Sequence, residues 1–283
     1  MERAAKLSAQ LCAGGKAAGA AGKKPLGDRH AHAVGLAASE LFSVRGKVAL
    51  VTGGSKGIGL MISSGLVSNG CKVYVCSRKA ELCEAAAAEL NAAAARLGSG
   101  GSAVSLPGDL STLAGVVAVA DALAAAEPAL HILVNNAGAT WGAPLEEYPD
   151  EAWQKVFDLN VRHLFNITQK VLPLLKRGGV HGDPARIVNI ASIDGIRATQ
   201  TSGPTAAFAY TTSKGAVVHL TRALSRALGE FDITVNCIAP GVFPYVRGLY
   251  LARAVTVARA YRLTFSDPRV RPQIRDDTLL GQL

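Results

Sequence analysis

Short apolar runs alternate along the chain with longer stretches in which apolar residues recur at helical spacing. A short apolar run bounded by turn residues is typical of a strand buried on both faces, whereas helical spacing predicts a helix with one apolar face. The predicted strands cover residues 48–51, 72–76, 103–106, 131–134, 186–190 and 233–238. The predicted helices cover residues 58–67, 79–97, 111–126, 150–175 and 210–228. This alternation predicts an α/β fold built on a doubly wound sheet.

A glycine-rich turn joins the first predicted strand to the first predicted helix, with the sequence Thr52-Gly53-Gly54-Ser55-Lys56-Gly57-Ile58-Gly59. Strand, glycine turn and helix in this order can hold a phosphate, because glycine lets the backbone approach closely and the helix N-terminus offers unpaired N–H groups. A chance cluster of glycines is the alternative, and the flanking strand and helix disfavour it. The residues expected to bind a dinucleotide here are Gly53, Ser55, Lys56, Gly57, Ile58 and Gly59.

The second predicted strand is followed by Ser77, Arg78 and Lys79. An acidic residue that could bind the ribose 2'-hydroxyl of NAD is absent from this position. Arg78, helped by Lys56, can instead pair with a 2'-phosphate, so the sequence favours NADP(H) and makes NAD(H) the less favoured cofactor. The alternative is that both cations are solvated surface charges.

Tyr210 and Lys214 lie four residues apart in the last predicted helix and therefore share one of its faces. An unperturbed tyrosine has a pKa of roughly 10, and a neighbouring cation favours the phenolate and lowers that pKa toward the working range. The pair predicts acid/base chemistry. Such pairs are also common on solvated helices, so the glycine turn and the strand pattern decide the interpretation.

Further residues complete a pattern that resembles the short-chain dehydrogenase/reductase family, in its common one-domain subtype, over about residues 41–241. The residues around the pattern are similar to the branch that contains 3-oxoacyl reductases. Besides the glycine turn, the residues that carry the resemblance are Asp109-Leu110, Asn135-Asn136-Ala137-Gly138, Asn160, Ser192, Tyr210, Lys214 and Pro240-Gly241.

The resemblance implies a Rossmann-type parallel sheet with the strand order 3-2-1-4-5-6, and it implies roles for the site residues. Tyr210 would donate a proton in ketone reduction and accept one in alcohol oxidation, Lys214 would lower the pKa of Tyr210 and hold the nicotinamide ribose, and Ser192 would hydrogen-bond the substrate oxygen. Asn160 would position a water that links Lys214 to solvent, or would satisfy backbone groups at a helix kink. The implied cofactor contacts are Asp109, Leu110, Asn136, Gly138, Tyr210, Lys214, Pro240 and Gly241.

Two residues near the expected site allow two interpretations each. Arg197, in the long segment between Ser192 and Tyr210, can meet an anionic substrate group or can be solvated, and solvation is the more common fate of an arginine. Trp141 can wall a substrate pocket or can pack beneath a loop.

The sequence departs from the family pattern after Gly241. We expect the seventh strand of the family to be missing or altered, which would leave the edge of strand 233–238 open. Residues 249–263 instead predict a basic amphipathic helix. The expected organisation is a flexible basic extension over residues 1–43, a reductase domain over 44–245 and an atypical basic segment over 246–283.

The formal net charge of +9 resides mostly in the two ends of the chain. Residues 1–46 hold seven Lys/Arg against three acids, and residues 242–283 hold seven Arg against three acids. The remainder is nearly neutral, so a nucleic-acid surface is not indicated. Five cysteines without a CxxC pair give no sign of a structural disulfide framework or a metal site.

No apolar run is long enough to span a bilayer, so we expect a soluble protein without a transmembrane segment. The basic leader resembles a mitochondrial transit segment, and a plain cytosolic extension explains it nearly as well, so cytoplasmic and mitochondrial locations both stay open.

Two functions are consistent with the sequence. The first is an NADP(H)-dependent ketoreductase or alcohol dehydrogenase that acts on a small-molecule carbonyl or secondary alcohol, with a 3-oxoacyl thioester as a candidate substrate. The second is a variant family member that binds NADP(H), has little or no catalytic activity and acts as a binding or interaction protein. The resemblance also implies a homodimer or homotetramer assembled through helices 150–175 and 210–228, if the altered C-terminal segment permits it.

Overall fold

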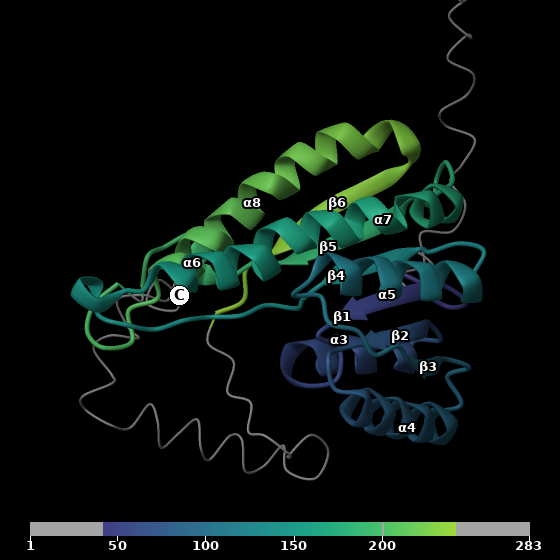
Figure 1. Cartoon of the computed structure of the whole chain (residues 1–283). Coiled ribbons are helices and arrows are strands. Elements are labelled where there is room, and N and C mark those ends of the chain that lie inside the picture. The colour runs from purple at the N-terminus through teal and green to yellow at the C-terminus, as the bar shows by residue number, and fades with distance from the viewer. Residues whose placement is uncertain (1–41, 200, 242–283) are drawn as a thin grey trace, which may run out of the picture. The chain divides into compact units, whose positions relative to one another are not determined.

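Figure 1 shows the computed structural model of the chain, which describes residues 42–199 and 201–241. Within these residues, six parallel strands form one sheet in the order β3-β2-β1-β4-β5-β6. The strand order and the Rossmann-type fold class expected from the sequence are therefore confirmed. The strands are β1 (Val48–Thr52), β2 (Lys72–Cys76), β3 (Ser102–Ser105), β4 (Ile132–Asn135), β5 (Ala185–Ile190) and β6 (Ile233–Ile238).

The strand order reverses at β1. The chain first runs outward from β1 through β2 to β3 and then returns to the other side of β1 with β4. The register pairs Val51 of β1 with Val75 of β2 on one side and with Val134 of β4 on the other. In open α/β sheets, ligands bind beyond the carboxyl ends of the strands at such a switch point. The loops after β1 and β4 are therefore the first place to look for a site.

Two layers of helices cover the sheet (Figure 1). The α-helices are α3 (Gly57–Ser68), α4 (Ala80–Leu97), α5 (Leu113–Ala126), α6 (Asp150–Phe157), α7 (His163–Gly178) and α8 (Phe208–Leu228). Helices α5, α7 and α8 share one apolar cluster with the sheet, and α3 and α4 share another. Neighbouring residues of β1 enter opposite clusters, Leu50 the first and Val51 the second, as the alternation of side chains along a strand requires.

The predicted helix over residues 150–175 is interrupted. Helices α6 and α7 are joined by a π-helical segment, η2 (Asp158–Arg162), which contains Asn160. Single π turns inside helices are frequently found at functional sites. Short 3-10 turns complete the described structure at η1 (Leu145–Glu147), η3 (Ile193–Gly195) and η4 (Gly229–Phe231).

Several expectations concern residues outside the described part of the chain. These are the altered or missing seventh strand, the basic helix over 249–263, and the extensions over 1–43 and 246–283. The division into these segments stays a prediction. No helix among the described residues is long and apolar enough to cross a membrane.

Two glycines of helix α3, Gly59 and Gly65, lie in opposite environments. A Cβ atom added at Gly59 would lie 2.1 Å from the carbonyl oxygen of Gly53 and 2.5 Å from Asn136 Nδ2, whereas a Cβ at Gly65 would meet nothing within 4 Å. Real Cβ atoms do not approach backbone oxygen that closely, so the glycine turn can keep this conformation only with glycine at position 59.

We predict opposite effects of the two alanine substitutions on stability. Gly59→Ala should lower the free energy of unfolding by roughly 1–3 kcal/mol or more, because the turn must move to admit the methyl group. Gly65→Ala, the control in the same helix, should raise it by up to about 1 kcal/mol, because glycine is a poor helix former. Urea unfolding of both variants checks this, and equal losses would contradict it.

Candidate active site

Thr52 and Asn136 join the glycine turn after β1 to the loop after β4. Asn136 Nδ2 donates to the carbonyl oxygens of Thr52 at 3.0 Å and of Gly53 at 3.2 Å. In return, Thr52 Oγ1 accepts from the N–H groups of Asn136 at 2.9 Å and of Ala137 at 3.0 Å, and it donates to the Val134 carbonyl at 3.2 Å. These reciprocal bonds fix the relative position of the two loops that border the switch point.

The glycine turn leaves the start of α3 accessible to an anion. Gly53 and Gly57 adopt positive φ angles of 64° and 58°, which side chains other than glycine rarely tolerate. Lys56 is the N-cap residue of α3, and no side chain caps the first turn of this helix. The free N–H groups and the positive end of the helix dipole are the features by which such turns bind phosphate.

The turn is also linked to the end of β2. Ser55 Oγ donates to Ser77 Oγ at 2.8 Å, and Ser77 Oγ lies 3.0 Å from Cys83 Sγ. Arg78 follows Ser77 and is exposed. Ser77 thus connects the glycine turn with the strand end that carries Arg78, a role that was not predicted from the sequence.

Asp109 lies near Arg78 at the end of the loop that follows β3. Burial acts to raise the pKa of Asp109, but the Ser111 N–H, which donates to Oδ1 at 2.9 Å, and the nearby Arg78 charge hold this pKa below its ordinary value. The ionised form is therefore favoured. Leu110 is 6% exposed and packs in the apolar cluster under α5, so its side chain belongs to the core.

Helix α8 carries Tyr210 and Lys214. Lys214 is 5% exposed, its Nζ donates to the Ile190 carbonyl at 2.8 Å, and it lies 5.6 Å from the centroid of the Tyr210 ring. Burial lowers the pKa of Lys214 to about 8, and the Coulombic effect of Cys237 opposes this shift. The pair expected from the sequence is thus brought together at the end of β5.

Asn160 holds the π-helical segment against the loop after β4. Its Oδ1 accepts from the Ala139 N–H at 2.8 Å, and its Nδ2 donates to the Ala139 carbonyl at 2.9 Å and to Ser213 Oγ at 3.0 Å. A Cβ at Gly138 would lie 3.3 Å from Asn160 Oδ1 and 3.6 Å from Lys214 Nζ. Gly138 therefore lies beside both residues. The interpretation of Asn160 as a backbone-satisfying amide agrees with these bonds, and the water relay stays a prediction.

Ser192 follows β5 and begins η3. Its Oγ accepts from the Asp194 N–H at 3.2 Å and donates to Asp194 Oδ2 at 3.4 Å. The turn is held from two sides. The Ile193 N–H donates to the Pro240 carbonyl at 3.0 Å, and a Cβ at Gly195 would lie 2.6 Å from the backbone carbon of Lys214. Close packing on α8 therefore fixes the position of Ser192.

The expected catalytic residues share one region of the fold, and the predicted cofactor contacts border it. Pro240 and Gly241, after β6, are connected to the serine turn through the bond to Ile193. No role was predicted from the sequence for Thr52 or Asp194. Thr52 is the first residue of the glycine pattern, but its side-chain bonds depend on the pairing of β1 with β4, which no local pattern reveals.

The loop that contains Trp141 packs on the start of α8. Tyr148 Oη donates to the Trp141 carbonyl at 3.2 Å and accepts from the Ala209 N–H at 3.1 Å. Lys155 Nζ lies 4.8 Å from the centroid of the Trp141 ring. These contacts hold the loop next to the start of α8, and both interpretations of Trp141 stay predictions. Arg197 is exposed.

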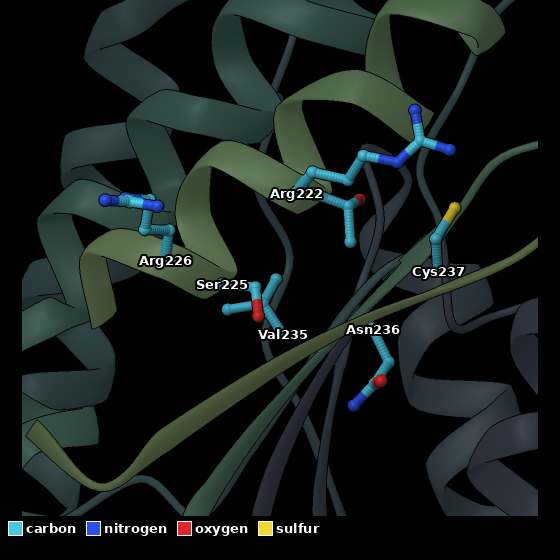
Figure 2. Close-up of a pocket in the computed structure, with 7 residues that line it drawn as sticks. Arg222, Ser225, Arg226, Val235, Asn236 and Cys237 are labelled. Atoms are coloured by element: carbon cyan, nitrogen blue, oxygen red, sulfur yellow. The ribbon is translucent and has the colours of Figure 1, made fainter. Parts of the chain in front are cut away.

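A separate surface pocket of about 450 Å³ lies between α8 and β6 (Figure 2). It contains none of the residues predicted to bind cofactor or substrate. The residues that line it are Thr221, Arg222, Ser225, Arg226, Val235, Asn236 and Cys237.

Comparison with known proteins gives consistent matches over this region. The sequence model of a family described as short chain dehydrogenase matches residues 47–245. A Pseudomonas aeruginosa protein named rhamnolipids biosynthesis 3-oxoacyl-[acyl-carrier-protein] reductase is 46% identical over 203 residues, which cover 72% of this chain and 75% of that protein. A Streptomyces coelicolor protein named putative ketoacyl reductase is 36% identical over 196 residues, which cover 69% and 70% of the two chains.

Solved structures match as well. The RhlG/NADP active-site complex of Pseudomonas aeruginosa has a TM-score of 0.66 and 43% identity and covers 81% of this chain and 80% of its own. A 3-ketoacyl-(acyl-carrier-protein) reductase from Brucella melitensis, complexed with NADH, has a TM-score of 0.61 and 30% identity, with coverages of 70% and 76%.

Proposed function

Since the chain belongs to the short-chain dehydrogenase family, we propose that it is an NADP(H)-dependent ketoreductase acting between a carbonyl and a secondary alcohol. The observation that supports the proposal is how the residues Asn160, Ser192, Tyr210 and Lys214 are held: Asn160 is bonded to the loop after β4, and the turn that begins at Ser192 packs through Gly195 on the backbone of Lys214. Lys214 lies beside the Tyr210 ring, and Gly138 lies beside both Lys214 and Asn160. An acid, a cation and a hydroxyl donor in one place are the parts that carbonyl reduction needs.

The glycine turn suits a dinucleotide. Gly53 and Gly57 allow the left-handed backbone of the turn, Gly59 allows α3 to pack closely on Gly53, and the uncapped start of α3 offers N–H groups to a pyrophosphate. Once bound, the cofactor supplies or accepts the hydride. The residues proposed to hold it are Gly53, Ser55, Lys56, Gly57, Ile58, Gly59, Arg78, Asp109, Leu110, Asn136, Gly138, Tyr210, Lys214, Pro240 and Gly241.

The proposed preference for NADP(H) over NAD(H) rests on Arg78. Its guanidinium is exposed at the end of β2, where the Ser55–Ser77 bond brings the glycine turn alongside. A planar guanidinium can bind a 2'-phosphate through two parallel hydrogen bonds. A similar structure contains NADP and another contains NADH, so the similarity to relatives alone does not select the cofactor.

In the proposed mechanism, the substrate oxygen accepts hydrogen bonds from Tyr210 and Ser192. Tyr210 gives its proton to the oxygen during reduction and takes one back during oxidation. Lys214 is mostly charged below its pKa of about 8, and this charge favours the phenolate form of Tyr210. Ser192 stabilises the negative charge that develops on the oxygen. Asn160 is proposed to hold a water through which Lys214 exchanges protons with solvent.

The substrate is proposed to be a small molecule with a ketone or secondary alcohol, and a 3-oxoacyl thioester is the first candidate. The 46% identity to a protein named as a 3-oxoacyl-[acyl-carrier-protein] reductase supports this candidate. We further propose assembly as a homodimer or homotetramer through the faces of α7 and α8, and a cytoplasmic or mitochondrial location.

The substitution Tyr210→Phe tests the proposed acid. We expect the reduction rate to fall by about 10²- to 10⁴-fold, because the proton donor is removed. Binding of NADPH, measured as the shift in thermal unfolding, should be kept. Tyr74→Phe is the control, since it removes a tyrosine hydroxyl that donates to Glu127 and contacts no proposed site residue. An unchanged rate in the Tyr210 variant would exclude the mechanism. A wild-type chain that binds NADPH and reduces no ketone would instead favour the alternative of a protein that binds NADP(H) without turnover.

The substitution Arg78→Ala tests the cofactor preference. We expect affinity for NADPH to fall by about tenfold to hundredfold, because charge-assisted bonds to the 2'-phosphate are lost, while affinity for NADH changes little. Arg96→Ala removes an exposed arginine from the last turn of α4 and should change neither. Fluorescence titration with both cofactors measures the affinities. Equal losses for NADPH and NADH would remove Arg78 from the 2'-phosphate site.

A further inference from the structure

Asp194 is a buried carboxylate that the proposed mechanism does not use. It is 7% exposed and lies two residues after Ser192 in the turn η3. Taking a carboxylate out of water is costly unless hydrogen bonds compensate for the lost hydration. The hydrogen-bond partners of Asp194 therefore indicate the role of this carboxylate.

The two carboxylate oxygens of Asp194 have different hydroxyl partners. Oδ1 accepts a hydrogen bond from Thr199 Oγ1, and Oδ2 accepts a long one, at 3.4 Å, from Ser192 Oγ. The ion pairs found among the described residues do not include Asp194. The carboxylate thus lies between the serine proposed to bind the substrate oxygen and a threonine farther along the same loop.

The backbone around the carboxylate is fixed. The Asp194 N–H donates to Ser192 Oγ at 3.2 Å, the Ile193 N–H donates to the Pro240 carbonyl, and Gly195 packs against the backbone of Lys214. With the backbone held in this way, rotation of the Asp194 side chain is the motion that can change its distance from Ser192. The bond to Thr199 opposes that rotation.

Ser192 has one proton to donate, and two acceptors would compete for it. A hydroxyl group carries a single O–H donor, and the proposed mechanism needs that donor on the substrate oxygen. A carboxylate at normal hydrogen-bond distance accepts from a hydroxyl strongly, at roughly 2.5–2.7 Å, whereas the bond at 3.4 Å is weak.

We propose that Thr199 holds the Asp194 carboxylate away from Ser192 and thereby keeps the serine proton available to the substrate oxygen. Asp194 and Thr199 are then positioning residues that act through Ser192. This inference rests on the proposed ketoreductase function. Without Thr199, the carboxylate moves closer to Ser192, accepts a stronger hydrogen bond from its hydroxyl and slows reduction, because that O–H is no longer free to donate to the substrate oxygen.

The first experiment tests the contact without turnover. Thr199→Val keeps the shape of the side chain and removes its hydroxyl, whereas Thr199→Ser keeps the hydroxyl. Amide hydrogen exchange over residues 196–199 of the full chain, the end of the loop that the bond from Thr199 ties to Asp194, should accelerate about threefold to tenfold in the valine variant and stay unchanged in the serine variant. Equal exchange in the wild-type and valine chains would overturn the proposal.

The second experiment tests whether the contact acts through Ser192. With NADPH and acetoacetyl-CoA, Thr199→Val should lower kcat about threefold to tenfold, with KM for NADPH unchanged. Thr199→Ser should behave as wild type. Combining Thr199→Val with Asp194→Asn should restore most of the rate, because a neutral amide accepts a weaker hydrogen bond from the serine hydroxyl than a carboxylate does.

A double-mutant cycle with Ser192→Ala separates positioning from general damage. If Asp194 and Thr199 act through the serine proton, Thr199→Val has no further effect in the Ser192→Ala background. The same fold loss in both backgrounds would overturn the proposal. If the wild-type chain reduces no ketone, the proposed function fails, and the exchange experiment alone then decides whether Thr199 restrains Asp194.

Discussion

The reciprocal hydrogen bonds between Thr52 and Asn136 are the constraint on which the rest of the site depends. They hold the ends of β1 and β4 together at the point where the strand order reverses. Close packing of Gly59 on Gly53 then sets the start of α3, and the loop that begins at Asn136 leads to Gly138 beside Lys214. A few bonds between the loops after β1 and β4 thus connect the proposed phosphate site with the proposed catalytic residues.

A second constraint is the packing of η3 against α8. Lys214 gives up hydration to donate to the Ile190 carbonyl, and burial lowers its pKa to about 8. Gly195 packs against the backbone of the same lysine, and this contact also fixes the position of Ser192, three residues earlier in the same turn. The geometry of serine, tyrosine and lysine is therefore set by backbone packing between η3 and α8. We infer that substitutions in either element act on all three residues together.

Most of the fold could be predicted from the sequence, because buried parallel strands are nearly continuous apolar runs. Strands β2 and β6 agree with their predicted bounds, β1 and β5 are one residue longer at one end, and β3 and β4 are each shifted by one residue. The π-helical segment was not predicted from the sequence, because Asn160 stabilises it through bonds to Ala139, which lies in another loop. Asp194 and Thr199 lie close to Ser192 in the sequence, but their residue types alone did not indicate a role. Their significance comes from hydrogen bonds that depend on the conformation of the loop after β5.

Transfer of deuterium from labelled NADPH is the most direct test of the central claim. The full chain would be mixed with NADPH that carries deuterium at either face of nicotinamide C4, together with a 3-oxoacyl thioester. Mass spectrometry of the product would follow. We predict a 3-hydroxyacyl thioester that carries one deuterium on the carbinol carbon with one of the two labelled cofactors and none with the other. No deuterated alcohol from either labelled form, with this thioester or with other ketones, would contradict it.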